Sequence, residues 1–207
     1  ISAVADIYGA KDYFWGWLMI AEAKLAFAPG INPVVEKASL VLDAWKKARI
    51  GIRGVSETGE KKIKAVGGSS AVYAWGESKP LSDKWEDMTV SVIPEEDCNL
   101  RIDLCGPHRP KEKGSKDILP IWAEYDDIKI EGATLENPSF ETLNARMLPE
   151  GWQCVPANVA ADASAAEGKI YVKACFNQPV VQTVSAKAGQ LVTITARVRR
   201  GMPAPKL

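Results

Sequence analysis

The sequence predicts an all-β sandwich, and three observations carry this prediction. From about residue 48 onward, apolar and polar residues alternate with a period of two, which is typical of strands buried on one face. Short turn-forming segments with Gly and Pro separate the alternating stretches. The chain has 207 residues, 46% of them hydrophobic, which is enough to bury a core without metal or disulfide crosslinks.

The alternating stretches follow one another as short strands with one apolar face. Each has an apolar residue (Val, Ile, Leu, Met, Ala or Phe) at every second position, and mostly polar residues between them. These stretches cover residues 88–92, 98–105, 170–176 and 192–198. The turn signals that separate the strands lie at residues 57–59, 66–69, 106–107, 113–115 and 188–189.

The first 48 residues have a mixed pattern. Trp15 and Trp17 share one face of an extended segment, so residues 13–27 are predicted to form a strand. Residues 34–48 have apolar side chains at helical spacing, and either a short helix or an irregular segment fits them. The apolar stretch 13–28 is only 16 residues long and contains two charged residues, so no membrane span is expected.

One strand changes its alternation part-way. Residues 121, 123 and 125 are apolar at odd positions, whereas Ile128 and Ile130 are apolar at even positions. The switch falls at Asp126-Asp127. A shift of one residue within a strand indicates a β-bulge, and bulges redirect side chains beside functional sites.

Four cysteines allow several arrangements. Cys98 and Cys105 are predicted to lie at opposite ends of one strand, roughly 23 Å apart at about 3.3 Å per residue, which excludes a bridge between them. Two alternatives remain: bridges from this strand to Cys154 and Cys175, or four reduced thiols.

The charge composition excludes several classes of function. The chain has 26 Lys and Arg residues against 26 Asp and Glu residues, so it lacks the basic excess of a nucleic-acid-binding protein. His108 is its only histidine. A single histidine excludes a His-rich metal site and argues against a Ser-His-Asp or Cys-His catalytic apparatus.

Several short motifs together resemble one family. Residues 125–132 read YDDIKIEG, residues 137–141 read NPSFE and residues 149–152 read PEGW. These motifs resemble the closing strand, the opening strand and the following Trp of galactose-binding-like jelly rolls that serve as carbohydrate-binding modules. Similarity to further strands of the family extends the resemblance over residues 70–200; these strands lie at residues 85–94, 99–104, 179–183 and 189–194. The resemblance implies a jelly-roll sandwich.

The order of these motifs departs from the family, because the closing-strand features come before the opening-strand features. One interpretation is a single, circularly permuted sandwich over residues 1–207. The alternative is that residues 1–132 are the C-terminal part of one sandwich and residues 133–207 the N-terminal part of a second. The single permuted domain is favoured, because half a sandwich would expose a core face and an unpaired edge.

The resemblance also implies a structural calcium ion near the opening and closing strands, although no cofactor is required. Glu141 matches the acidic residue of the opening motif, and Asp126 or Asp127 matches the acidic pair of the closing one. Carboxylate oxygens at adjacent strand ends suit Ca²⁺. The alternative is that these are ordinary solvated carboxylates.

Aromatic residues beside strand ends are the candidates for ligand contact. The first candidates are Tyr73 with Trp75, and Trp15 with Trp17; Arg53 and Arg101 could add hydrogen bonds. For each aromatic pair, packing in the core is the alternative. Trp85 and Trp152 match core aromatics of the family and are expected to pack inside.

The sequence therefore predicts a non-catalytic carbohydrate-binding protein whose partner is a glycan or polysaccharide. It also implies an exported setting, either secreted, periplasmic or cell-surface. One alternative is a structural or adhesion domain that contacts another protein. A glycoside hydrolase is a third and weaker reading, because the acidic residues at 95–97 and 126–127 are adjacent and point to opposite faces of a strand.

Overall fold

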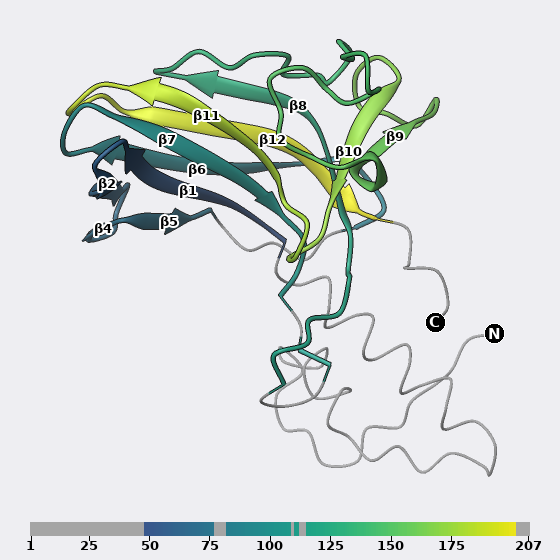
Figure 1. The fold of residues 1–207 in the computed structure, drawn as a ribbon, viewed down its shortest axis with the longest axis horizontal. Helices are drawn as coiled ribbons and strands as arrows, with labels where there is room; N and C mark the ends of the chain where they lie inside the picture. Colours follow the sequence, from purple (N-terminus) through teal and green to yellow (C-terminus); the bar gives the residue numbers. More distant parts are fainter. Residues whose placement is uncertain (1–47, 77–81, 109, 112–114, 202–207) are drawn as a thin grey trace, which may run out of the picture. The chain divides into compact units, whose positions relative to one another are not determined.

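The computed structural model describes residues 48–76, 82–108, 110–111 and 115–201, which form two antiparallel sheets (Figure 1). The predicted all-β sandwich is confirmed. The predictions for residues 13–27 and for 34–48, apart from Ala48, lie outside the described residues. Within the described part, no helix is long and apolar enough to cross a membrane.

The first sheet has five strands and carries the candidate site. Its three long strands pair in the order β11, β7 and β1. Two short strands, β2 and β5, both pair with the side of β1 that faces away from β7. The bounds are β1 Arg49–Ser56, β2 Gly59–Lys61, β5 Tyr73–Trp75, β7 Cys98–Cys105 and β11 Val180–Ala186.

The second sheet has seven strands in the order β4, β3, β6, β12, β8, β10 and β9, with β12 between β6 and β8 (Figure 1). A short 3₁₀ helix, η3 (Pro156–Asn158), precedes β9. The bounds are β3 Ile63–Ala65, β4 Ser70–Ala71, β6 Glu86–Pro94, β8 Ala123–Glu131, β9 Val159–Ala161, β10 Ile170–Ala174 and β12 Val192–Arg200.

The core follows the alternation read from the sequence. In β12, buried residues alternate with half-buried ones over most of the strand, and in β7 the inward positions Leu100, Ile102 and Leu104 are fully buried. Ile50 and Ile52 of β1 are buried in the same way. The polar residues between them therefore lie on the outer faces of the two sheets.

Strands from both sides of residue 132 pair with each other. β7 pairs with β11 over seven residues, and β8 pairs with both β10 and β12. Each sheet thus contains strands from both segments. The jelly-roll order and the circular permutation remain predictions.

The predicted bulge is present in β8. Lys129 pairs with Thr195 and Asp126 pairs with Arg197, so two residues of β8 stand opposite Ala196 alone. Asp127 has a φ of 44°, which no regular strand residue adopts. The bulge returns Ile128 to the core and leaves the Asp126 side chain buried.

Residues 137–141, which resemble an opening strand, do not form one. Asn137 and Phe140 have φ values of 48° and 62°, and this conformation breaks an extended chain. The segment is instead a turn that buries the Phe140 ring 4.9 Å from the Trp152 ring. Trp152 is 6% exposed and donates its indole N–H to the Asn137 carbonyl at 3.0 Å, so its predicted core position is confirmed.

Trp85 does not pack in the core as predicted. It directly precedes β6 and is only partly buried, and it lies on the same side of the chain as the outward-facing Asp87 and Thr89. There the Arg199 guanidinium lies 4.2 Å from the Trp85 ring centroid, and the Trp85 N–H donates to the Ser164 carbonyl at 2.8 Å. Arg199 also donates to the buried Glu124 carboxylate at 2.5 Å.

Candidate functional site

The candidate site is the outer face of the five-stranded sheet, here called the outer face. It consists of the outward-pointing residues of β1, β5, β7 and β11. Because Ile50 and Ile52 point into the core, their neighbours in β1 point outward. The same argument applies to β5, where Ala74 is buried between two outward aromatic residues. The outer face contains Arg49, Gly51, Arg53, Tyr73, Trp75, Asn99, Arg101, Asp103, Thr183 and Ser185.

Tyr73 and Trp75 form an aromatic pair close to the sheet. Their ring centroids are 4.4 Å apart, with an interplanar angle of 85°. Trp75 pairs in register with Gly51, and a Cβ atom at Gly51 would lie only 2.3 Å from the Tyr73 hydroxyl and 3.0 Å from the Trp75 ring. A glycine at this position therefore gives the two rings room to lie against the strand.

Arginine side chains cover both rings. The guanidinium of Arg53 lies 5.1 Å from the Tyr73 ring centroid, and that of Arg49 lies 5.3 Å from the Trp75 centroid. Both distances suit cation–π attraction. The Nε atom of Arg53 is buried and has no hydrogen-bond acceptor among the described residues. The face thus combines aromatic surface with hydrogen-bond donors.

Polar residues of β7 and β11 continue this face. Arg101 donates to the Asp103 carboxylate at 2.8 Å, which holds the guanidinium at a fixed position beside Tyr73. Asn99 and Ser185 are hydrogen-bonded at 3.0 Å near the other end of the sheet. Amide, hydroxyl and guanidinium groups of this kind select hydroxyl-bearing ligands by hydrogen-bond geometry.

Two partly or fully buried groups at the outer face, the Tyr73 phenol and the Cys105 thiol, have raised pKa values. Burial raises the pKa of the Tyr73 phenol, and Cys105 and Asp103 raise it further. Burial likewise raises the pKa of the Cys105 thiol to about 12. At neutral pH neither group is ionised, so neither acts as a nucleophile or base there.

A cavity of about 310 Å³, here called the end cavity, lies where β1 begins and β7 ends. It is lined by Arg49, Trp75, Cys105, Gly106, His108 and Phe176. His108 and Phe176 contact each other with ring centroids 4.4 Å apart. Phe176 belongs to a predicted strand over 170–176, but β10 ends at Ala174, and this places Phe176 in the loop beside His108.

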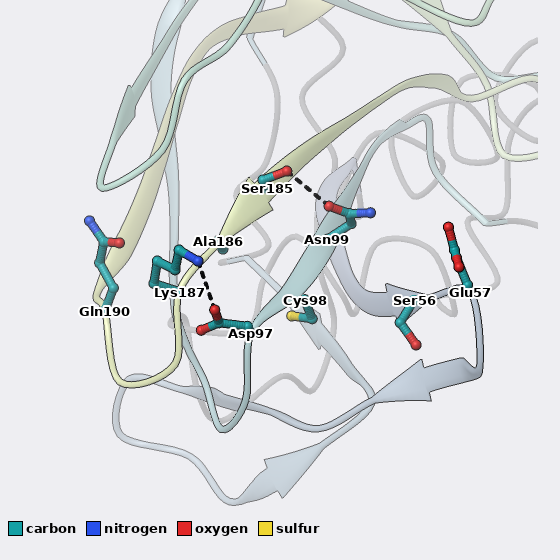
Figure 2. A pocket seen from close by; sticks show the side chains of 9 residues that line it. All are labelled: Ser56, Glu57, Asp97, Cys98, Asn99, Ser185, Ala186, Lys187 and Gln190. Carbon is teal, nitrogen blue, oxygen red and sulfur yellow. Dashed lines mark hydrogen bonds and ion pairs between the residues drawn. The ribbon is translucent and has the colours of Figure 1, made fainter.

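A second cavity, of about 360 Å³, lies at the opposite end of the same sheet, where β1 and β11 end and β7 begins (Figure 2). Four of its polar side chains are already paired with one another: Lys187 donates to Asp97 at 2.7 Å, and Ser185 bonds Asn99 at 3.0 Å. None of the described residues that line it is aromatic. The end cavity is therefore the better candidate for a ring-shaped ligand.

The structure brings four predicted ligand-binding residues together on the outer face: Tyr73, Trp75, Arg53 and Arg101. Trp15 and Trp17 lie outside the described residues. The sequence analysis did not select Arg49, His108 or Phe176, which come from three separate segments. Of these three residues, only Arg49 could have been found from the sequence. It lies four positions from Arg53 in the same strand, so the two side chains share one face.

Two of the three predicted calcium residues, Asp126 and Glu141, hold the loop at residues 166–170 through its backbone. The Asp126 carboxylate accepts the backbone N–H groups of Ala166 and Glu167 at 2.7 and 3.0 Å. The Glu141 carboxylate accepts those of Lys169 and Ile170 at 2.8 and 2.7 Å. Asp127 forms an ion pair with Lys129 at 3.1 Å instead.

The two carboxylates at this loop are oxygen ligands of the type that Ca²⁺ prefers. No group of three or more His, Cys, Asp or Glu side chains that could hold a metal ion lies in the described part of the chain. Further ligands would have to be carbonyl oxygens or water. Burial raises the pKa of Asp126. The backbone hydrogen bonds that its carboxylate accepts lower this pKa, but by less than burial raises it. A cation would favour the ionised form. Calcium at Asp126 and Glu141 remains a prediction.

If calcium binds there, the melting temperature should rise by about 5–10 °C at a calcium concentration about 100-fold above Kd, which corresponds to about 2.7 kcal/mol. Differential scanning fluorimetry with CaCl₂ and with EGTA measures this rise. Glu141→Gln should abolish the rise, whereas Glu150→Gln, an exposed carboxylate on the same segment, should retain it. Equal melting temperatures in CaCl₂ and EGTA would contradict the prediction.

The remaining acidic and thiol groups do not form a site. Glu96 and Asp97 pair with Lys61 and Lys187 at 2.9 and 2.7 Å at the surface. Cys98 and Cys105 lie at opposite ends of β7, as predicted, and all four cysteines are free thiols.

Comparisons of the chain with protein-family models, with curated proteins and with solved structures found no match in any of the three.

Proposed function

We propose that this protein binds a glycan or polysaccharide on the outer face, without catalysis. The observation that supports this most directly is the Tyr73–Trp75 pair, which lies over Gly51 with a guanidinium group above each ring. Sugar rings present apolar C–H faces and a rim of hydroxyl groups. An aromatic ring can pack against the C–H face of a sugar, and polar side chains beside it can form hydrogen bonds with the hydroxyl groups.

The exposure of Trp75 is consistent with this role. It is 38% exposed, whereas Trp152 is 6% exposed and packs in the core. Among the residues that the structure describes, the other exposed large apolar side chains lie on separate segments of the chain: Val66, Met147, Val155 and Leu191. This distribution favours a sugar over a protein partner, which would need a continuous apolar patch. An exported setting, where polysaccharides are met, is part of the proposal.

Affinity gel electrophoresis and isothermal titration calorimetry against a polysaccharide panel test the proposal. Trp75→Ala should weaken binding by about 10- to 100-fold, because aromatic anchors of this kind contribute about 1.4–2.7 kcal/mol. The matched control is Met147→Ala, which removes an exposed apolar side chain elsewhere and should bind as the wild type does.

Two outcomes would argue against this function. Failure to bind any polysaccharide, with capture of a defined protein partner instead, would favour the adhesion alternative. An increase in reducing ends during incubation with a bound polysaccharide would favour a glycoside hydrolase. We expect neither.

A further inference from the structure

The described residues that line the end cavity include a cation and no carboxylate. Arg49 is the only Arg or Lys among them, and the others are aromatic, thiol, glycine or imidazole groups. By contrast, the second cavity is lined by Glu57 and Asp97 as well as Lys187. The two ends of the sheet therefore offer different charge environments to a ligand.

Arg49 also differs from the other arginines of the outer face. Arg53 pairs with Glu60 at 3.4 Å and Arg101 pairs with Asp103 at 2.8 Å. Among the described residues Arg49 has no carboxylate partner, and its guanidinium lies over the Trp75 ring. A guanidinium presents a planar fork of N–H donors that matches a carboxylate in a bidentate manner.

Aromatic groups flank this guanidinium. Trp75 is 38% exposed and contributes one aromatic wall of the cavity, and Phe176 with His108 forms a second. A volume of about 310 Å³ is at the lower end of the range for small-molecule sites, about 300–1,000 Å³. A ligand that fits must therefore be compact, with a flat apolar face and a negative charge at its edge.

We propose that the end cavity accepts an acidic sugar, a hexuronic acid residue whose carboxylate binds Arg49 and whose ring lies against Trp75. This inference rests on the proposed glycan binding and narrows it to uronate-containing polysaccharides. The remaining outer face, with Tyr73, Arg53 and Arg101, would contact the neighbouring sugars of the chain.

Uronate oligosaccharides and their methyl esters provide a matched test with the full chain. The esters keep the sugar ring and its stereochemistry but remove the charge. Oligogalacturonate, oligoglucuronate and oligomannuronate are titrated by calorimetry beside their esters and beside a panel of neutral glucans, xylans and galactans. We expect at least one acid to bind 10-fold or more tightly than its ester, and 0.5 M NaCl to reduce this preference.

Arg49 variants connect the preference to the cavity. Arg49→Met should remove the preference for the acid over the ester, and Arg49→Lys should keep part of it, because a lysine retains the charge but not the fork of donors. Arg146→Met, which removes an exposed arginine in the loop after residue 144, should leave it unchanged. Circular dichroism and thermal melts of each variant establish that it is folded.

The outcomes separate this inference from the proposed function. Binding of neutral glycans without preference for any uronate, or an acid preference that survives Arg49→Met, would overturn the inference and leave glycan binding standing. Absence of binding to every acidic, esterified and neutral glycan would overturn both. The comparison of acid with ester uses the wild type, so the lack of an acid preference would overturn the inference even if the variants do not fold.

Discussion

Replacing Arg199 with Met should lower the free energy of unfolding by about 3–5 kcal/mol, the largest loss we expect from a single side chain. The Glu124 and Arg199 side chains are 3% and 13% exposed, and their ion pair is 2.5 Å long. Without Arg199 the Glu124 carboxylate would be buried without its ion-pair partner. Urea unfolding followed by tryptophan fluorescence measures the change.

A second variant and a control separate the ion pair from simple loss of packing. Glu124→Gln combined with Arg199→Met should recover much of the loss, because no unpaired charge remains buried. Lys187→Met breaks an ion pair whose side chains are 76% and 61% exposed, and it should destabilise the protein far less than Arg199→Met does. If Arg199→Met and Lys187→Met have equal effects, the buried pair is not what stabilises this part of the sheet.

Replacing Gly106 with Ala should destabilise the protein by about 3 kcal/mol. The new Cβ would lie 2.3 Å from the Ile121 carbonyl oxygen, 2.6 Å from the Ala174 carbonyl oxygen and 2.6 Å from the Cys175 Cα. All three are backbone atoms, so a change of rotamer cannot relieve the contacts. Chemical denaturation gives the difference in free energy.

The control for this substitution is another Gly→Ala change. Gly68 is exposed, and a Cβ there would meet only the Ala65 side chain closely, at 3.2 Å. Gly68→Ala should change stability by less than about 1 kcal/mol. A Gly106→Ala variant as stable as Gly68→Ala would show that the segments around Ile121 and Ala174 move apart easily.

The strands were predictable because their patterns are local. Alternation in β7 and β12 marks the buried face directly, and the shift from Tyr125 to Ile128 marks the bulge. Residues 137–141 were interpreted wrongly as a strand. Their composition suits a strand, but Asn137 and Phe140 have positive φ values, and the Phe140 ring packs against Trp152, a contact that no local pattern contains.

The candidate site was predictable only in part, for a related reason. Tyr73 and Trp75 lie two positions apart in one strand, and alternate residues of a strand share a face, so the sequence alone predicts that their side chains lie together. The end cavity joins residues 49, 75, 105, 106, 108 and 176, and this grouping depends on how β1, β5, β7 and the loop after β10 meet. A single sequence does not specify that arrangement.

The edges of the five-stranded sheet have a consequence for self-association. On one side, the sheet ends in two separate short strands, β2 and β5, which pair with different parts of β1 and have three residues each. On the other side, Gln153 pairs with Val181 of β11 through two backbone hydrogen bonds of 2.7 and 3.0 Å. Short strands at one edge and the bridge at Val181 at the other interrupt the edges of this sheet in the described part of the chain, which hinders strand addition by a second molecule, the first step of amyloid-like aggregation.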